Sequence, residues 1–145
     1  MKLSYAALAF GAALAFSVPA AAQESSYTPT TVWQFSNIKV EPGQFENYMD
    51  YLSTTYRKNM ELAKQMGGVL SYHIFSVNNP RRNEPDLILA VEYKDYTPVA
   101  EQLAIQKRMQ AAMAMDSRRM ESASGERAKM RTEIGSMELQ ELRFK

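Results

Sequence analysis

Cysteine is absent from the 145 residues, and histidine and tryptophan occur once each, as His73 and Trp33. Without cysteine the chain forms no disulfide, and it has no thiolate nucleophile and no thiolate ligands for zinc or an iron–sulfur cluster. A lone histidine also argues against a histidine-rich metal site. No nucleotide-binding loop, nucleophile elbow, calcium loop or paired-carboxylate motif is present. The sequence therefore predicts neither a metal nor a cofactor.

The chain also lacks an excess of either charge, because 17 Lys and Arg residues stand against 16 Asp and Glu residues. A nucleic-acid-binding protein needs a basic footprint, so this balance argues against nucleic acid as a partner. It argues equally against electrostatic attachment to a membrane surface. Beyond the first residues, no apolar run is long enough to cross a bilayer.

The chain begins with an apolar leader. Lys2 precedes an apolar stretch from Leu3 to Val18, and Ala20-Ala21-Ala22 supplies the small residues of a cleavage site. This pattern predicts a secretory signal peptide over residues 1–22, and the apolar run is short for a membrane anchor. Cleavage leaves 123 residues with 16 basic and 16 acidic side chains. We expect a single domain in the periplasm or outside the cell.

Strand and helix patterns alternate along the rest of the chain. Runs of alternating β-branched and aromatic residues indicate strands, and apolar residues at three- and four-residue steps indicate an amphipathic helix. The predicted order is a flexible lead-in over 23–30, a strand over 31–40, a helix over 44–66, strands over 69–77 and 87–93, a second helical region from Thr97-Pro98, and a strand over 137–144. Residues 31–145 then form one domain of β-α-β-β-α-β order.

The second helical region carries its own start and stop signals. Thr97 is predicted as its N-cap and Pro98 as its first helical residue. The small residues Ser122–Gly125 are predicted to interrupt it. A last helical piece over 126–134 would then end at Gly135, since glycine is favoured just past a helix end.

The element order carries a resemblance to a known group of proteins. The turn Val40-Glu41-Pro42-Gly43-Gln44-Phe45 before a helix, and the strand sequence Leu89-Ala90-Val91-Glu92-Tyr93, are its local cues. Together with the β-α-β-β-α-β order they make the chain similar to the ferredoxin-like dimeric α/β-barrel superfamily. That group includes stress-responsive barrel proteins, antibiotic-biosynthesis and heme-degrading monooxygenases, and small cofactor-free cyclases and lyases.

The resemblance implies an α+β fold in which a four-stranded antiparallel sheet carries helices on one face. It also implies a homodimer whose two sheets pack into a barrel, and a site in the cleft between sheet and helices. Heme-degrading members use an asparagine, a tryptophan and a histidine. Asn37, Trp33 and His73 do not match the distribution of those residues over the elements, so no catalytic role is carried over.

His73 is the leading catalytic candidate, because an imidazole titrates near neutral pH and can serve as a general acid or base. It lies in an apolar strand between Ser71 and Phe75, and the alternative is a structural histidine bonded to a backbone carbonyl. Pairing the apolar faces of the hairpin would put Tyr93, the second catalytic candidate, on the same face. A register shift of one residue would instead bring Glu92 beside His73.

An aromatic cleft is expected near these residues. Trp33 and Phe35 are predicted to face the helices, and tyrosines from the first helix are predicted to point down toward them. Such a cleft would suit a flat apolar or phenolic ligand; the alternative is that these aromatic residues are ordinary core. The predicted substrate-binding residues are Trp33, Phe35, Tyr48, Tyr56, Glu92 and Arg143, the last if it points inward.

Two other groups of residues are assigned no part in a site. The methionines of the second helical region are expected to fill the core or a dimer contact, although their flexible side chains could line a pocket; they are Met109, Met113, Met115 and Met120. Arg127 and Arg131 are interleaved with acidic residues. That pattern predicts a solvated helix face and not an anion site.

Two functions remain open. One is an exported, cofactor-independent enzyme of lyase, isomerase or oxygenase type that acts on a small aromatic molecule in the cleft. In that case His73 or a tyrosine would move a proton. The other is a non-catalytic dimeric module that binds a ligand or a partner protein, and it is supported by the lack of a recognisable catalytic constellation.

Overall fold

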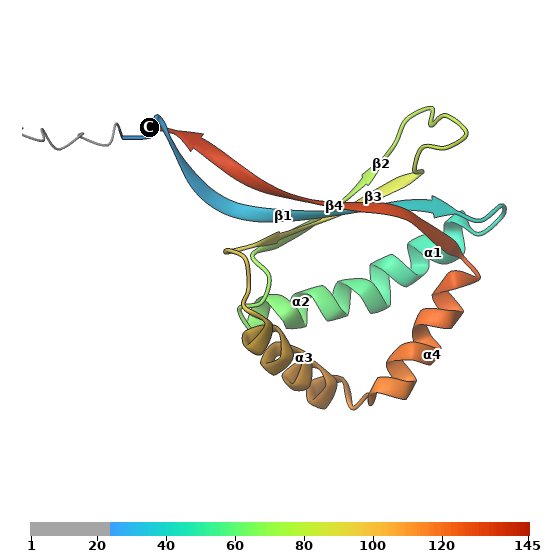
Figure 1. Ribbon diagram of the computed structural model, residues 1–145. Helices are drawn as coiled ribbons and strands as arrows, with labels where there is room; N and C mark the ends of the chain where they lie inside the picture. Colours follow the sequence, from blue (N-terminus) through green and yellow to red (C-terminus); the bar gives the residue numbers. More distant parts are fainter. Residues whose placement is uncertain (1–23) are drawn as a thin grey trace, which may run out of the picture.

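The computed structural model describes residues 24–145, so the predicted signal peptide over residues 1–22 lies outside the described residues. Its elements are β1 (Tyr27–Val40), α1 (Phe45–Tyr51), a π-helical turn η1 (Leu52–Tyr56), α2 (Arg57–Gln65), β2 (Ser71–Ser76), β3 (Leu87–Tyr93), α3 (Val99–Met113), α4 (Ser117–Ala128) and β4 (Arg131–Phe144). Helices α1 and α2 continue through η1 as one rod (Figure 1). The predicted β-α-β-β-α-β order and the α+β class are therefore confirmed.

The four strands form one antiparallel sheet in the order β2-β3-β1-β4. All the helices lie on the same side of it (Figure 1). This arrangement agrees with the fold that the resemblance to the ferredoxin-like superfamily implies. Within one chain the sheet is open, because β2 and β4 are edge strands and do not pair with each other.

The core lies between the sheet and the first helical rod. It is formed by Ile38 from β1, Tyr48 from α1, Leu52 from η1, and Leu87 and Leu89 from β3. The most exposed of the five, Leu89, is only 8% exposed. Full burial of an aliphatic side chain of this size contributes roughly 1.5–3 kcal/mol, so this cluster is the main hydrophobic attachment of the first helical rod to the sheet.

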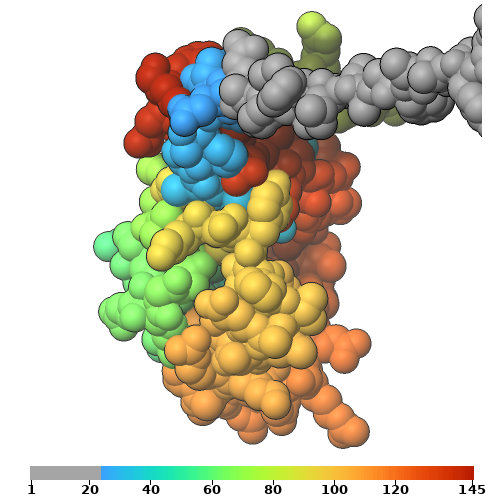
Figure 2. Space-filling view, turned by 60° about the vertical axis from the view of Figure 1, so that its left-hand side comes forward, coloured from blue at the N-terminus to red at the C-terminus, as the bar shows by residue number. Residues whose placement is uncertain are grey.

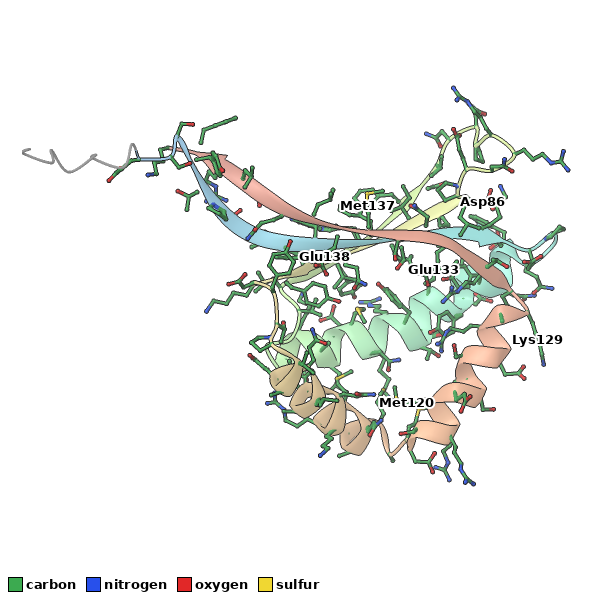
Figure 3. The ribbon with its side chains drawn as sticks, in the orientation of Figure 1. Asp86, Met120, Lys129, Glu133, Met137 and Glu138 are labelled. Atoms are coloured by element: carbon green, nitrogen blue, oxygen red, sulfur yellow. The ribbon has the colours of Figure 1, made fainter. Side chains whose placement is uncertain are left out.

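The strand register sorts the side chains onto two faces. The helix face carries Gln34, Ser36, Ile38, Leu89, Val91 and Tyr93. The opposite side, which we call the open face, carries Trp33, Phe35, Asn37, Ser71, His73, Phe75, Ala90, Glu92, Met137 and Leu139. Figure 3 shows Met137 on the open side and Glu138 on the helix side of β4.

Strand β1 begins earlier than predicted. Tyr27 pairs with Phe144, and Pro29 pairs with Leu142, so residues 27–30 belong to the sheet and are not a flexible lead-in. The polar, proline-containing sequence of this segment does not predict a strand. The segment is held in the sheet by pairing with the far end of the chain. The paired ends of β1 and β4 extend together past β2 and β3 (Figure 1).

The second helical region breaks at a different place from the one predicted. Ala114 takes a left-handed conformation with φ of 51° at the end of α3, and Asp116 caps α4 by accepting a hydrogen bond from the Arg119 amide at 2.8 Å. Helix α4 runs through Ser122–Gly125 without interruption. Gly135 lies inside β4, opposite Asn37, and is not a helix cap.

The start of this region also differs by one residue. Pro98 occupies the N-cap position of α3, and no side chain caps the helix, so the predicted roles of Thr97 and Pro98 are wrong. Seen from the end at which β1 begins, α3 lies beside α2 (Figure 2). Between residues 24 and 145, no helix has both the length and the apolar character needed to span a membrane.

Candidate functional site

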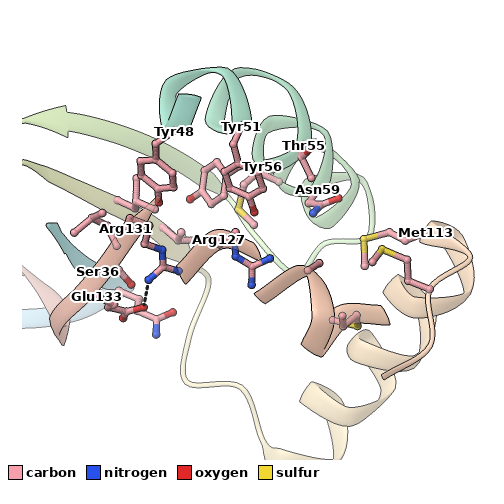
Figure 4. Close-up of a pocket in the computed structure, with 18 of the residues that line it drawn as sticks. Ser36, Tyr48, Tyr51, Thr55, Tyr56, Asn59, Met113, Arg127, Arg131 and Glu133 are labelled. Atoms are coloured by element: carbon pink, nitrogen blue, oxygen red, sulfur yellow. Dashed lines mark hydrogen bonds and ion pairs between the residues drawn. The ribbon is translucent and has the colours of Figure 1, made fainter. Parts of the chain in front are cut away.

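A cavity of about 390 Å³ lies between the helix face of the sheet and the helices. Its volume falls within the range of small-molecule sites. Four tyrosines line it, Tyr48, Tyr51, Tyr56 and Tyr93, together with four methionines, Met60, Met113, Met115 and Met120. Figure 4 shows three of these tyrosines pointing from the first helical rod toward the sheet.

The π-helical turn explains how the first rod brings its tyrosines together. The Arg57 amide donates to the Leu52 carbonyl, five residues back instead of four. This wider turn changes the helical phase, so Tyr51 and Tyr56, five residues apart, both reach the cavity. Single π-helical turns inside α-helices frequently occur at functional sites.

Three of the four cavity tyrosines, Tyr48, Tyr56 and Tyr93, are held as neutral phenols. Burial raises the pKa of Tyr48 and of Tyr56 above the usual value of a tyrosine. Burial also raises the pKa of Tyr93, and the Glu138 carboxylate adds to that shift. At neutral pH these hydroxyls therefore retain their protons and can donate hydrogen bonds.

Two polar atoms at the cavity are buried without a hydrogen-bond partner in the described part of the chain. They are the Tyr56 hydroxyl and Nε of Arg131. Neighbouring groups are already engaged, because Arg131 Nη1 donates to Glu133 Oε2 at 3.3 Å and the Tyr93 hydroxyl donates to Gln34 Oε1 at 3.2 Å. An unpaired buried polar group costs about 1–3 kcal/mol, so these two atoms stand out from the rest of the lining.

Arg127 and Arg131 do not form the solvated helix face that the sequence predicted. Both line the cavity, and the Arg127 guanidinium carbon lies 5.8 Å from the ring centroid of Tyr51. Lys129, between them, points to solvent and pairs with Glu126 at 2.8 Å. The two arginines lie at the end of α4 and the start of β4. The acidic residues near them in the sequence predicted solvent exposure, so the sequence did not indicate that both arginines line one cavity.

His73 lies outside the cavity. Its side chain is exposed on the open face, where its ring centroid is 5.9 Å from those of Trp33 and of Phe75. The Trp33 and Phe35 rings are 6.1 Å apart in the same stripe. The prediction that Trp33 and Phe35 face the helices is therefore wrong. The helix face of β1 carries Gln34, Ser36 and Ile38 instead, and Ile38 is fully buried.

The observed hairpin register separates Tyr93 from His73. Glu92 lies opposite both Trp33 and Ser71 on the open face, and its carboxylate accepts a hydrogen bond from the Ser71 hydroxyl. Tyr93 lies on the helix face and lines the cavity. Of the two registers considered, the structure has the one that puts Glu92 on the same face as His73.

The remaining predicted binding residues divide between the two faces. Tyr48 and Tyr56 reach the cavity. Arg143 does not, because it pairs with Thr28 near the end of β4 and its side chain is 72% exposed. The cavity thus brings together Tyr48, Tyr56 and Tyr93, and it adds Arg127 and Arg131, which sequence reasoning had set aside.

Within residues 24–145, no group of three or more His, Asp or Glu side chains is arranged to hold a metal ion. The donors at the cavity are phenols, the hydroxyls of Ser36 and Thr55, guanidiniums and side-chain amides. These groups suit an organic ligand with hydrogen-bond acceptors.

The comparisons with known proteins add little to this geometry. No protein-family model matches the chain, and no curated protein sequence matches it. Among solved structures, the chain is similar to the crystal structure of protein SO0527 from Shewanella oneidensis, with 11% sequence identity and a TM-score of 0.48. The likeness covers 81% of this chain and 98% of that chain.

Proposed function

We propose that this protein binds a small, flat, aromatic molecule in the cavity between sheet and helices. The observation that carries the proposal is that Tyr56 Oη and Arg131 Nε, both buried and both without a partner among residues 24–145, line the same cavity. A ligand that supplies partners to both atoms removes their desolvation cost. The binding energy thus has a specific polar source besides apolar contact.

The apolar part of the cavity supports an aromatic ligand. The Tyr48 and Tyr51 rings are stacked, with centroids 5.9 Å apart and planes 10° apart. Aromatic rings favour such offset stacks with further aromatic groups. The methionines that line the cavity are flexible and adapt to the outline of a ligand.

The experiment that tests the proposal is a titration of isotope-labelled methionine methyl groups with benzamide and with benzoate, followed by NMR. We expect the signals of Met60, Met113 and Met120, which line the cavity, to shift in a saturable way. Met137 lies on the open face and serves as the internal control. If no cavity methionine shifts at saturating concentrations of either probe, or if Met137 alone shifts, the proposal is wrong.

A variant of the tyrosine gives a sharper result. Tyr56→Phe keeps the ring and removes the unpartnered hydroxyl, so we expect affinity for benzamide to fall about five- to tenfold. Tyr96→Phe is the matched control, because Tyr96 is 54% exposed and outside the cavity. Equal affinity in wild type and Tyr56→Phe would show that this hydroxyl does not contact the ligand.

The second candidate function is a cofactor-independent enzyme of lyase, isomerase or oxygenase type that acts on the same aromatic ligand. The Tyr56 hydroxyl favours it, because a neutral phenol without a partner can donate a hydrogen bond to an oxygen of the bound molecule on which negative charge develops. His73 has no role in this version. Mass spectrometry of a phenolic ligand after incubation would decide between the two, with Tyr56→Phe expected to bind the ligand and leave it unchanged.

The proposal also covers the location of the protein and its self-association. We propose that the mature protein works in the periplasm or outside the cell, as the leader over residues 1–22 predicts. We also propose that a second copy of the chain covers the open face. That face presents Phe75, Met137 and Leu139, which are 48–50% exposed, and contiguous exposed apolar side chains of this kind are typical of interfaces.

A further inference from the structure

We infer that Arg127 and Arg131 form an anion-binding subsite in the cavity, and that the ligand is a small aromatic carboxylate. The inference rests on the proposed function and narrows it, because it names the ionic group of the ligand. It gives these two arginines a purpose that neither the sequence pattern nor the fold requires.

The position of the two guanidiniums is the first argument. Arg127 comes from the last turn of α4 and Arg131 is the first residue of β4. Both side chains lie beside the tyrosines of the first helical rod, and Arg131 is directed toward Glu133 (Figure 4). The Arg131 side chain is only 19% exposed. A cation that is largely removed from water is costly unless anions and hydrogen bonds compensate it, and Glu133 engages only Nη1 of Arg131.

The charge balance of the cavity is the second argument. The ionised side chains in its lining are Arg127, Arg131 and Glu133. Glu133 is the only carboxylate among them, and it bonds to Nη1 of Arg131. Tyr48, Tyr56 and Tyr93 contribute no negative charge at neutral pH, since burial raises their pKa. One positive charge is left over, which suits a monoanion.

The hydrogen-bonding capacity is the third argument. Glu133 occupies one donor of Arg131, and Nε remains buried without a partner in the part of the chain that the structure describes. Guanidinium groups bind carboxylates through parallel N–H donors, and such charge-assisted bonds are about twice as strong as neutral ones. Arg127 supplies further donors beside the Tyr51 ring. A carboxylate there would leave the ring of the ligand beside the tyrosine stack.

The test compares benzoate with benzamide, which has the same size but no charge, by isothermal titration calorimetry. We expect wild type to bind benzoate at least about tenfold more tightly than benzamide, as a charge-assisted bond predicts. Arg131→Gln and Arg127→Gln should each reduce that preference severalfold, because the loss of a charged donor weakens the binding of benzoate more than that of benzamide. Arg118→Gln is the matched control, because Arg118 is exposed on α4 and outside the cavity.

Glu133→Gln should have the opposite effect on the affinity for benzoate. It removes the competing carboxylate from Arg131 Nη1 and should raise benzoate affinity severalfold. If Arg131→Gln does not fold, as thermal melting would show, Arg127→Gln and Glu133→Gln still decide the question. Equal affinity of wild type for benzoate and benzamide, or a benzoate preference unchanged in Arg127→Gln, would overturn the anion subsite. If neither probe shifts the cavity methionines, the proposed function itself fails.

Discussion

The two faces of the sheet are both rich in aromatic residues, yet they differ in what covers them. On the helix face, tyrosines enclose a cavity with two arginines at its wall. On the open face, Trp33, His73 and Phe75 form a stacked stripe with no protein cover in the described chain. Aromatic content alone therefore does not identify a binding site. The difference lies in the buried polar atoms without partners, which occur at the cavity.

The open face is nevertheless ordered. Ala90, in the centre of β3, lies opposite Phe35 on one side and His73 on the other. It is fully buried, with 0% exposure, although no helix lies above it. Large rings on the flanking strands close over this small side chain. The rings around Ala90 thus form a packed patch on the open face, which is a suitable contact surface for a second protein molecule.

The largest expected difference between the faces is in stability. Leu52→Ala removes a side chain that is 1% exposed between helix and sheet, and we expect it to lower the free energy of unfolding by about 2–5 kcal/mol. Leu139→Ala, at a position 50% exposed on the open face, should cost about 1 kcal/mol or less. Urea denaturation of both variants, measured at low protein concentration, checks the contrast. Similar losses would mean that the open face is part of the core.

The sequence predicts which residues of a strand share a face, but it does not predict which of the two faces meets the helices. The pattern correctly grouped Trp33 with Phe35 and separated them from Val32 and Ile38. Which group meets the helices depends on how the helical connections cross the sheet, and local sequence does not encode that. Strand 87–93 was predicted at the observed bounds, because the polar loop over 78–86 marks its start clearly.

The cavity was harder to predict than the fold. The tyrosines of the first helix were identified by their spacing, and Tyr48 and Tyr56 do reach the cavity. Arg127 and Arg131 were missed because α4 ends between them, so helical spacing does not describe their relation. The start of β4 was also missed, since its first residues are mostly polar and exposed, as is common in edge strands.

The second prediction concerns self-association through the open face. Phe75→Glu puts a charge into the aromatic stripe, and we expect it to weaken the dimer by about 2 kcal/mol or more, as for a central interface residue. Leu103→Glu is the control, because Leu103 on α3 is similarly exposed, at 52% against 50%. Sedimentation equilibrium measures both. A wild-type chain that is monomeric at high concentration, or a dimer that Leu103→Glu disrupts instead, would contradict the proposed interface.

The third prediction concerns the pH dependence of stability that arises from the buried Tyr56 hydroxyl. Burial raises the pKa of Tyr56, so the folded state favours the protonated phenol. The resulting stability is fully present below the unfolded pKa of about 10 and is lost as pH rises above that value. Tyr56→Phe should flatten the fall in the free energy of unfolding between about pH 9 and pH 11. An unchanged alkaline slope would mean that the hydroxyl is not buried in solution.

The smallest expected effect is that of His73→Ala on ligand binding. His73 lies on the open face and the cavity on the other, so we expect the affinities for benzoate and benzamide to change less than about twofold, within the additivity of separate sites. Tyr56→Phe, measured in the same titrations, should reduce both. If His73→Ala weakens ligand binding while Tyr56→Phe does not, the ligand binds on the open face, and the contrast drawn between the two faces is reversed.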